Sequence, residues 1–297
     1  MQVWLNGRLV DSASATISVF DRGFLFGDAV YEVVRYFNGH PVGLDLHVAR
    51  LEQSLALTSI RGFDAGSLRT IGEALLGAHS FSDASVYLQV SRGAAPTRVH
   101  LPTPGMMPTV FACVSSCGVL ADLNRVPEVA ARTARDERWH RCEIKSTALL
   151  GNLLPLLDAT ATGADEAILL RGDLVSEGTS SNVFVEVSGR LVTPPVASDP
   201  PILNGVMRTR LLEACAQAGI PCGVRPVSAA ELRASSEIVL TASRRMFSAV
   251  TSLDGVRVGD GVAGPLARRA NAALVEGLQR ECRIGSATTA ATPILAS

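Results

Sequence analysis

The sequence predicts a two-domain protein of mixed α/β (α+β) structure. Its 297 residues are enough for two domains of ordinary size, each with its own core. The first third alternates apolar and polar residues around two Asn-Gly turns, and later short apolar runs alternate with segments of helical periodicity. We therefore expect a small N-terminal domain over residues 1–120, a larger domain over 121–283 and a disordered Ala/Thr-rich tail over 284–297.

The first domain is expected to begin with hairpins. Asn-Gly is the strongest short-range hairpin signal. Asn6-Gly7 joins runs 3–5 and 8–10, and Asn38-Gly39 joins runs 31–37 and 41–44. Asp45 is a candidate N-cap for the helix that follows. Later elements are expected as helix 68–76, strand 85–91, a proline-rich loop 94–108 and strand 109–114. They would form a small antiparallel sheet with helices on one face.

The second domain is expected to contain shorter strands between longer helices. Pro155 should kink the first of these helices or mark its restart, because proline removes a hydrogen bond from the helix. The C-terminal helix precedes the tail. Strands are expected at 129–133, 167–170, 183–187, 190–192, 238–241 and 247–250, and helices at 146–161, 206–218 and 266–280.

Composition narrows the possible functions. The chain is 47% hydrophobic and 19% charged, and its formal net charge is −1, so nothing favours a nucleic acid or an acidic membrane surface. No apolar run is long enough to span a membrane, and the N-terminus does not resemble a secretory signal. The six cysteines are scattered and suggest neither a zinc site nor a disulfide framework. We expect a cytoplasmic enzyme with free thiols and no metal.

Two charged residues are the strongest candidates for chemistry. Lys145 stands in the run Cys-Glu-Ile-Lys-Ser, where apolar and small neighbours can desolvate it and make its amine a nucleophile. Glu177 enters a Gly/Ser-rich turn, from which a carboxylate can partner a ring nitrogen. Together they suggest pyridoxal phosphate, which needs a lysine for its aldehyde and an acid for its pyridinium. Singly, an exposed lysine and a plain turn are the commoner explanations.

Other residues add weaker signals. Tyr31 could present its hydroxyl from a strand, and Arg50 could bind a phosphate with its planar guanidinium. Arg98 and His100 stand two apart in the proline-rich loop, a spacing that suits a carboxylate. The helix start at 204–208 and the strand end at 240–243 could supply N–H groups and hydroxyls to phosphate. The glycines at 259–264 match a dinucleotide pattern by letters, but without a βαβ unit we interpret them as a turn.

In this order the segments resemble the class IV aminotransferases, the fold type IV group of pyridoxal-phosphate enzymes, from about residue 2 to 280. The resemblance implies a cofactor between two domains and Lys145 as the Schiff-base lysine. It further implies that Glu177 holds the pyridine nitrogen and that Leu203 packs on the ring. The implied phosphate site comprises Arg50, the backbone N–H groups of Val206 and Met207, and the Thr241 hydroxyl. The most specific segments are 21–33, 144–146, 163–167, 177–184 and 202–206.

Within this family, segments 87–93, 97–100 and 138–145 are similar to the D-amino-acid aminotransferases. In that group Tyr31, Arg98 and His100 would trap the substrate carboxylate, with the Arg98 loop supplied by the neighbouring subunit of a homodimer. The implied reaction is ping-pong transfer of an amino group from a D-amino acid to a 2-oxo acid. A branched-chain L-aminotransferase, an aminodeoxychorismate lyase and an (R)-amine transaminase are alternatives. Met207 and Ser243-Arg244-Arg245 depart from the family pattern, and their effects on cofactor affinity and side-chain specificity stay open.

Overall fold

Both Asn-Gly turns form the hairpins that the sequence predicts. The computed structural model describes residues 1–197, 199 and 201–286. Asn6 and Gly7 have φ angles of 47° and 93°, and Asn38 and Gly39 have 50° and 77°, as tight turns with two left-handed residues require. The strands they join are β1 (Gln2–Leu5) with β2 (Arg8–Asp11), and β3 (Ala29–Phe37) with β4 (His40–Pro41).

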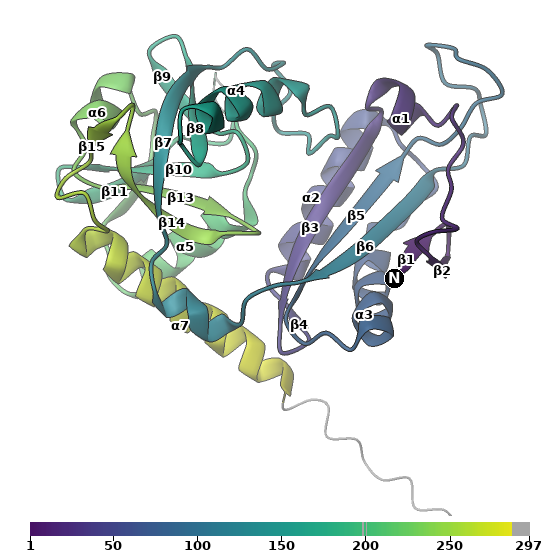
Figure 1. Ribbon diagram of the computed structural model, residues 1–297, viewed down its shortest axis with the longest axis horizontal. Helices are drawn as coiled ribbons and strands as arrows, with labels where there is room; N and C mark the ends of the chain where they lie inside the picture. Colours follow the sequence, from purple (N-terminus) through teal and green to yellow (C-terminus); the bar gives the residue numbers. More distant parts are fainter. Residues whose placement is uncertain (198, 200, 287–297) are drawn as a thin grey trace, which may run out of the picture.

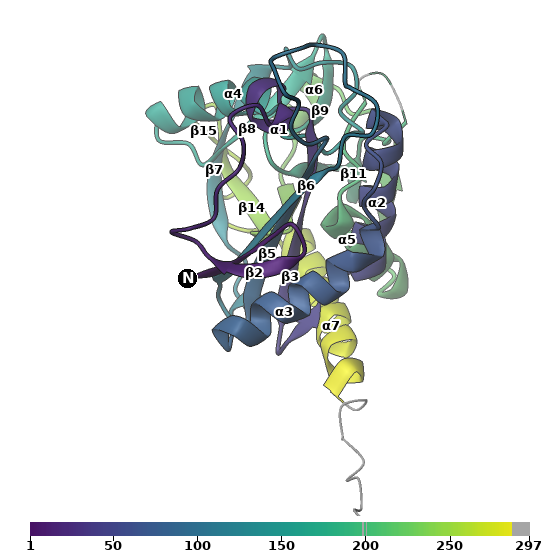
Figure 2. The same ribbon diagram turned by 90° about the vertical axis from the view of Figure 1, so that its right-hand side faces the viewer.

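These strands belong to a six-stranded antiparallel sheet with the order β2-β1-β6-β5-β3-β4. Its centre is formed by β5 (Ala84–Ser91) and β6 (Thr109–Ser116). The helices α2 (Leu44–Thr58) and α3 (Leu68–His79) cover one face, where Leu51 and Leu75 are fully buried in a common core with Val86 (Figure 2). The predicted antiparallel sheet with helices on one face is confirmed.

A second sheet forms the other lobe of the molecule (Figure 1). Its order is β12-β11-β10-β13-β14-β7-β8-β9, with β15 paired to β14. β9 and β10 lie far apart in this order, yet only residues 179–181 separate them in the chain, so the sheet curls back on itself. Its strands are β7 (Glu128–Arg135), β8 (Glu166–Arg171), β9 (Leu174–Gly178), β10 (Asn182–Val187), β11 (Arg190–Thr193), β12 (Cys222–Val224), β13 (Ile238–Ala242), β14 (Met246–Leu253) and β15 (Val256–Arg257).

Strand alternation gives this sheet a core on each face. Val183 and Val185 of β10 pack in one cluster, while Phe184 between them packs in the other, against α5 and α7. Phe37 and Val42 of the first lobe join this second cluster, so the lobes share apolar packing. The remaining helical elements are α1 (Arg22–Phe26), η1 (Ala65–Ser67), η2 (Leu120–Asn124), α4 (Leu150–Ala161), α5 (Val206–Gln217), α6 (Ala229–Ala234) and α7 (Pro265–Ser286).

Two expected helix starts are wrong. Asp45 is not an N-cap: α2 begins at Leu44 after Gly43, whose left-handed φ of 59° and close approach to Val206 favour glycine. The helix expected from residue 146 begins at Leu150. Residues 146 and 147 instead pair with β3, since the Thr147 N–H donates to the Ala29 carbonyl at 3.0 Å.

The structure also differs from the predicted elements, or decides between them, at Pro155, at Glu177 and near the C-terminus. Pro155 lies inside α4, which does not restart there. Glu177 lies on β9, a strand that the sequence analysis did not predict, as it did not predict β12, β15 or α6. Residues 284–286 of the expected tail belong to α7, and 287–297 lie outside the described residues. Within the described part of the chain, no helix is long and apolar enough to cross a membrane.

Candidate active site

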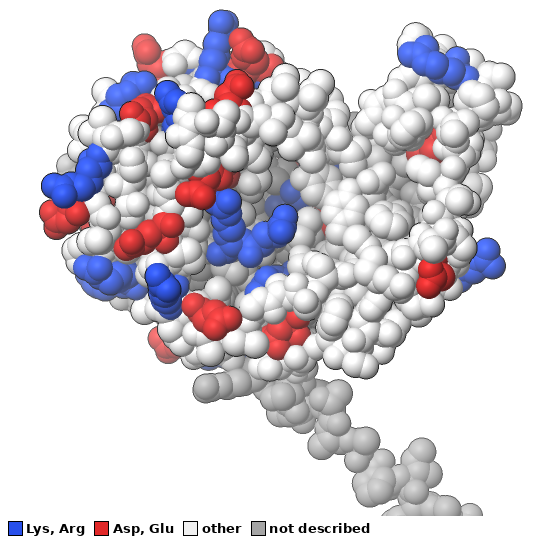
Figure 3. Space-filling view, in the orientation of Figure 1, with Lys and Arg blue, Asp and Glu red and all other residues white. Residues whose placement is uncertain are grey.

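A cavity opens where the two lobes meet. Its walls come from β3, from the segment 138–149 after β7, from the β9–β10 turn and from the start of α5. Figure 3 shows the hollow between the lobes, with Lys and Arg side chains gathered at its mouth. All the predicted site residues line it except Arg98 and His100. The fold therefore brings together residues that are as much as 210 positions apart, from Tyr31 to Thr241.

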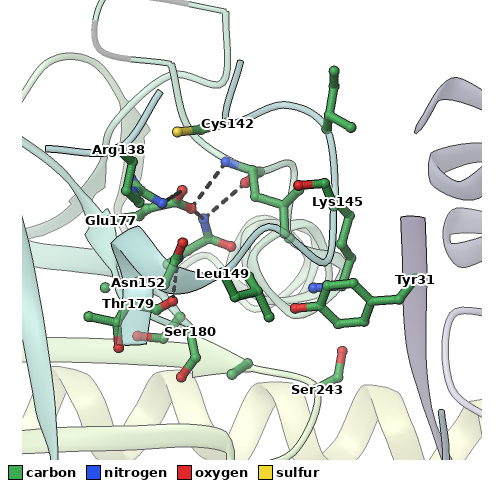
Figure 4. Close-up of a pocket in the computed structure, with 18 of the residues that line it drawn as sticks. Tyr31, Arg138, Cys142, Lys145, Leu149, Asn152, Glu177, Thr179, Ser180 and Ser243 are labelled. Atoms are coloured by element: carbon green, nitrogen blue, oxygen red, sulfur yellow. Dashed lines mark hydrogen bonds and ion pairs between the residues drawn. The ribbon is translucent and has the colours of Figure 1, made fainter. Parts of the chain in front are cut away.

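Lys145 is the only lysine of the chain. The segment that holds it is fixed to β3, because the Tyr31 N–H donates to the Lys145 carbonyl at 3.0 Å. The Lys145 amine Nζ lies 4.2 Å from the centroid of the Tyr31 ring, and Figure 4 shows both side chains in the pocket. Lys145 is half-buried, so its amine projects from a fixed wall into space that a ligand can enter.

Glu177 lies buried across this pocket from Lys145 (Figure 4). Its Oε1 accepts from Arg138 Nη1 at 2.8 Å, and its Oε2 accepts from the Leu203 N–H and from Asn182 Nδ2, each at 3.1 Å. Burial raises the pKa of Glu177, and Arg138 opposes this shift. The carboxylate is held in one orientation and retains acceptor capacity for a further donor from the cavity.

Arg50 is oriented by a buried acid. Its Nε and Nη2 donate to the two carboxylate oxygens of Glu32 at 2.8 and 2.7 Å, and its Nη1 donates to the Asn204 carbonyl at 2.8 Å. Glu32 also contacts His47 Nδ1 at 2.6 Å. Burial alone would raise the pKa of Glu32, but Arg50 and His47 hold it well below its usual range. These contacts leave guanidinium N–H groups of Arg50 available to a ligand.

The start of α5 completes the wall. The backbone N–H groups of Val206 and Met207 belong to the first turn of this helix, where they have no acceptor within the helix. Thr241 lines the same cavity, and its hydroxyl is buried without a hydrogen-bond partner among the described residues. A Cβ at Gly205 would lie 1.8 Å from Asn182 Oδ1, so only glycine fits at this helix entry. A helix N-terminus, a free hydroxyl and a guanidinium form a suitable site for an anion.

Comparison with known proteins agrees with this arrangement. The family model described as amino-transferase class IV matches residues 29–253. The chain belongs to the class IV aminotransferases. It is 38% identical to the D-alanine aminotransferase of Bacillus licheniformis, over 95% of this chain and 98% of that protein. It is 35% identical to the D-alanine aminotransferase of Listeria innocua, with the same coverage.

Solved structures agree on the fold of this aminotransferase. The branched-chain aminotransferase of Thermoproteus uzoniensis with norvaline has a TM-score of 0.84 and 26% identity, covering 95% of this chain and 97% of that one. The branched-chain amino acid aminotransferase of Escherichia coli has a TM-score of 0.83, at 23% identity and 91% coverage of each chain. The second likeness shows the fold alone. The predicted family and fold type IV architecture are confirmed.

Class IV aminotransferases use pyridoxal 5′-phosphate, and the cavity of this aminotransferase fits that cofactor. The partnerless Thr241 hydroxyl and the α5 start offer donors to a phosphate. The only lysine and a buried carboxylate line the same cavity, and these side chains suit an aldehyde and a ring nitrogen. Met207, noted as a departure from the family pattern, is the second residue of α5, and its side chain, which has no hydroxyl, packs in an apolar core.

Arg98 and His100 lie outside the cavity of their own chain. Both are exposed and contact Phe26: Arg98 Cζ lies 5.0 Å from the Phe26 ring centroid, and the His100 ring, tilted by 43°, has its centroid 5.6 Å away. Arg22 fixes this loop by donating to the Val99 and His100 carbonyls at 2.7 and 2.8 Å. One chain therefore does not bring the predicted carboxylate trap together with Tyr31.

A further departure from the family pattern lies at the cavity mouth. Ser243-Arg244-Arg245 forms the turn between β13 and β14, and Ser243 lines the cavity. Arg244 and Arg245 are exposed, and Arg245 Nη2 donates to the Asp165 carbonyl at 3.3 Å. The turn thus adds positive charge beside the site.

Sequence reasoning missed the residues that hold the charged groups of the site in place. Glu32 and Arg138 orient Arg50 and Glu177 but were not singled out, because their partners are distant in sequence. Glu166 was also missed; its buried carboxylate accepts from the Thr179 N–H and from three hydroxyl groups of the β9–β10 turn. One available signal went unused: a chain with a single lysine leaves no other side-chain amine for Schiff-base chemistry.

Proposed function

We propose that the enzyme transfers the amino group of a D-amino acid to a 2-oxo acid. The observation that supports transamination most directly is the position of the only lysine across one cavity from the buried Glu177. The choice of D-amino acids is supported by the D-alanine aminotransferases, which are 33–38% identical over 90–95% of the chain. Small-molecule amino acids and 2-oxo acids are accordingly its substrates.

In this proposal the cofactor is held at both ends. Its phosphate would be bound by Arg50, the N–H groups of Val206 and Met207, and the Thr241 hydroxyl. Leu203 would pack against the ring, and the Glu177 carboxylate would accept a hydrogen bond from the ring nitrogen. When bound, the cofactor supplies an electron sink for the pair left when the substrate loses its Cα proton.

The protein moves the proton. Lys145 Nζ would accept the Cα proton of the substrate as a general base and donate a proton back as a general acid. Glu177 would favour the protonated form of the ring nitrogen. The Tyr31 ring lies against the Lys145 amine at 4.2 Å and limits the directions in which that amine can move. The fixed 145–147 segment therefore delivers one base to one face of the substrate.

We further propose a homodimer in which Arg98 and His100 enter the neighbouring subunit's cavity and bind the substrate carboxylate. These side chains are exposed and distant from the cavity of their own chain, while Arg22 fixes the loop that holds them. An apolar face on α4 supports the same assembly, because Leu150, Leu153, Leu154 and Leu157 are 47–67% exposed. The six free thiols favour a cytoplasmic enzyme. We also propose that the chain consists of two domains, with their boundary near residue 120.

Mixing two impaired variants tests the shared site, when the mixture is assayed at a D-amino-acid concentration too low for Arg98→Ala homodimers to turn over substrate appreciably. If Arg98 acts in the neighbouring subunit, a hybrid of Lys145→Ala and Arg98→Ala protomers contains one intact site. Random exchange of equal amounts should then restore about a quarter of the wild-type activity, because half of the dimers are hybrids with one working site each. Absence of recovery from hybrids verified by native mass spectrometry would place Arg98 and Lys145 in the same subunit's site, or outside catalysis.

A panel of D- and L-amino acids with 2-oxoglutarate tests the proposed substrate class. We expect turnover of D-alanine or D-glutamate and little turnover of L-leucine. A branched-chain L-aminotransferase is the second candidate, because the Thermoproteus uzoniensis enzyme shares the fold at 26% identity. Preference for L-leucine or L-valine over every D-amino acid would select that candidate and reject ours.

A further inference from the structure

Beside Glu177 lies a cluster of charges that the proposed reaction does not use. It consists of Asp136, Arg138 and the less deeply buried Arg171. Arg138 donates through Nε and Nη2 to the two oxygens of Asp136, at 2.9 and 3.0 Å, and through Nη1 to Glu177 at 2.8 Å. The Arg138 side chain is only 6% exposed and that of Asp136 is fully buried. One guanidinium thus connects two buried carboxylates.

Asp136 fixes Arg138 from behind. It also accepts from the Ser176 hydroxyl at 2.7 Å and lies 3.2 Å from Arg171 Nη2. Burial acts to raise the pKa of Asp136, but hydrogen bonds from Arg138 and Ser176 hold it at about 2. Asp136 is therefore an anion at neutral pH. It holds the guanidinium by two parallel hydrogen bonds, the strongest and most directional form of such a pair.

We propose that Arg138, anchored by Asp136, is a positioning residue that keeps the Glu177 carboxylate ionised and turned towards the cofactor's ring nitrogen. This inference rests on the placement of that nitrogen beside Glu177 in the proposed function. Arg138 itself does not exchange a proton with the substrate. Its charge determines whether the proton shared by Glu177 and the ring nitrogen is bound to the acid or to the nitrogen.

The contact between Arg138 and Glu177 determines which of two groups holds a shared proton. Glu177 and the ring nitrogen share one proton, which can reside on the nitrogen and leave a carboxylate, or on the acid and leave a neutral pyridine. Arg138 Nη1 donates directly to Glu177 Oε1 at 2.8 Å, whereas a ring nitrogen that bears a proton is itself a donor and would have to bind this carboxylate rather than the guanidinium. The charge of Arg138 therefore stabilises the carboxylate more than it repels the pyridinium. Without Arg138, burial would favour the neutral pair, and the ring would accept electrons poorly.

The test uses the holoenzyme loaded with cofactor that is ¹⁵N-labelled at the ring nitrogen. The ¹⁵N chemical shift at neutral pH reports whether this nitrogen bears a proton, which a purely structural role for Arg138 would not change. Arg138→Met removes the charge and the hydrogen bond, whereas Arg138→Gln keeps a donor and removes only the charge. Arg138→Lys restores a charge. Arg141→Gln is the matched control, since Arg141 lies in the same segment and its ion pair with Glu143 is partly exposed.

We expect a protonated nitrogen in the wild type, in Arg138→Lys and in Arg141→Gln, and an unprotonated one in Arg138→Met and Arg138→Gln. The first half-reaction should slow about 10- to 100-fold in Arg138→Met, the range for losing one hydrogen bond to a charged group, and by less in Arg138→Gln, which keeps a donor. If Arg138→Met does not fold, Arg138→Gln decides. A protonated nitrogen in Arg138→Gln would overturn the inference while leaving the proposed function intact. A wild type that binds no cofactor would instead overturn the proposed function.

Discussion

Replacing Glu32 by Gln should destabilise the protein and weaken its hold on the cofactor. Glu32 is fully buried and ties Arg50 and His47 together through contacts of 2.6–2.8 Å. An amide has nearly the same shape but no charge, and its NH₂ group would face donors on Arg50. The substitution therefore leaves the Arg50 guanidinium buried without its counter-ion. Arg50 would also lose the orientation that directs its remaining N–H groups into the cavity.

The free-energy cost of Glu32→Gln follows from the burial of the Glu32–Arg50 ion pair. Removing one partner of a buried ion pair costs about 3–5 kcal/mol, and the amide's retained hydrogen bond favours the lower end, about 3 kcal/mol. Glu143→Gln is the matched control, because Glu143 pairs with Arg141, a side chain that is 49% exposed. Loss of such an exposed pair costs about 0.2–1 kcal/mol. Both variants replace one glutamate by glutamine, but Glu32 belongs to a buried ion pair and Glu143 to an exposed one.

Urea unfolding of the cofactor-free proteins measures both losses, and fluorescence titration measures cofactor affinity. Since the folded-state pKa of Glu32 lies below its unfolded value, its stabilising contribution is present above the unfolded pKa and is lost as pH falls through the folded pKa. The difference between wild type and Glu32→Gln should therefore shrink on acidification from pH 7. Equal unfolding free energies for Glu32→Gln and Glu143→Gln at pH 7 would refute the reasoning.

Three further predictions concern the site itself. Lys145→Ala produces a chain without any lysine, so it should lose the visible absorbance of the bound cofactor and nearly all turnover; wild-type turnover would show that the nucleophile is misassigned. Glu177→Gln should keep the cofactor bound but slow proton abstraction, and unchanged single-turnover rates would contradict that role. Arg98→Ala should raise KM for D-alanine or D-glutamate, since a lost charged hydrogen bond costs about 1.5–3 kcal/mol. Cofactor affinity and activity on a small amine without a carboxylate should change far less, and an equal loss on both substrate types would argue against the carboxylate trap.

Local chemistry explains which elements the sequence predicts. The hairpins follow from Asn-Gly turns, whose left-handed angles few other residues adopt. The start of α4 could not be predicted, because residues 146 and 147 are taken by hydrogen bonds to β3, more than a hundred positions earlier. β9 was missed for a related reason. Its Ser176 and Glu177 look like turn residues, yet they are buried because Asp136 and Arg138 partner them.

The same distinction applies to the site. Lys145, Glu177 and Arg50 stand in recognisable runs, whereas Glu32 and Arg138 become meaningful only when the fold brings them to Arg50 and Glu177. Two of the charged side chains that line the cavity are thus paired with an opposite charge, Arg50 with Glu32 and Glu177 with Arg138. Because these contacts lie within the chain, the orientation of both groups is fixed by folding, and less ordering cost falls on ligand binding. Variants of Glu32 and Arg138 should therefore act on catalysis through the geometry and ionisation of residues they touch, rather than through contacts with the substrate.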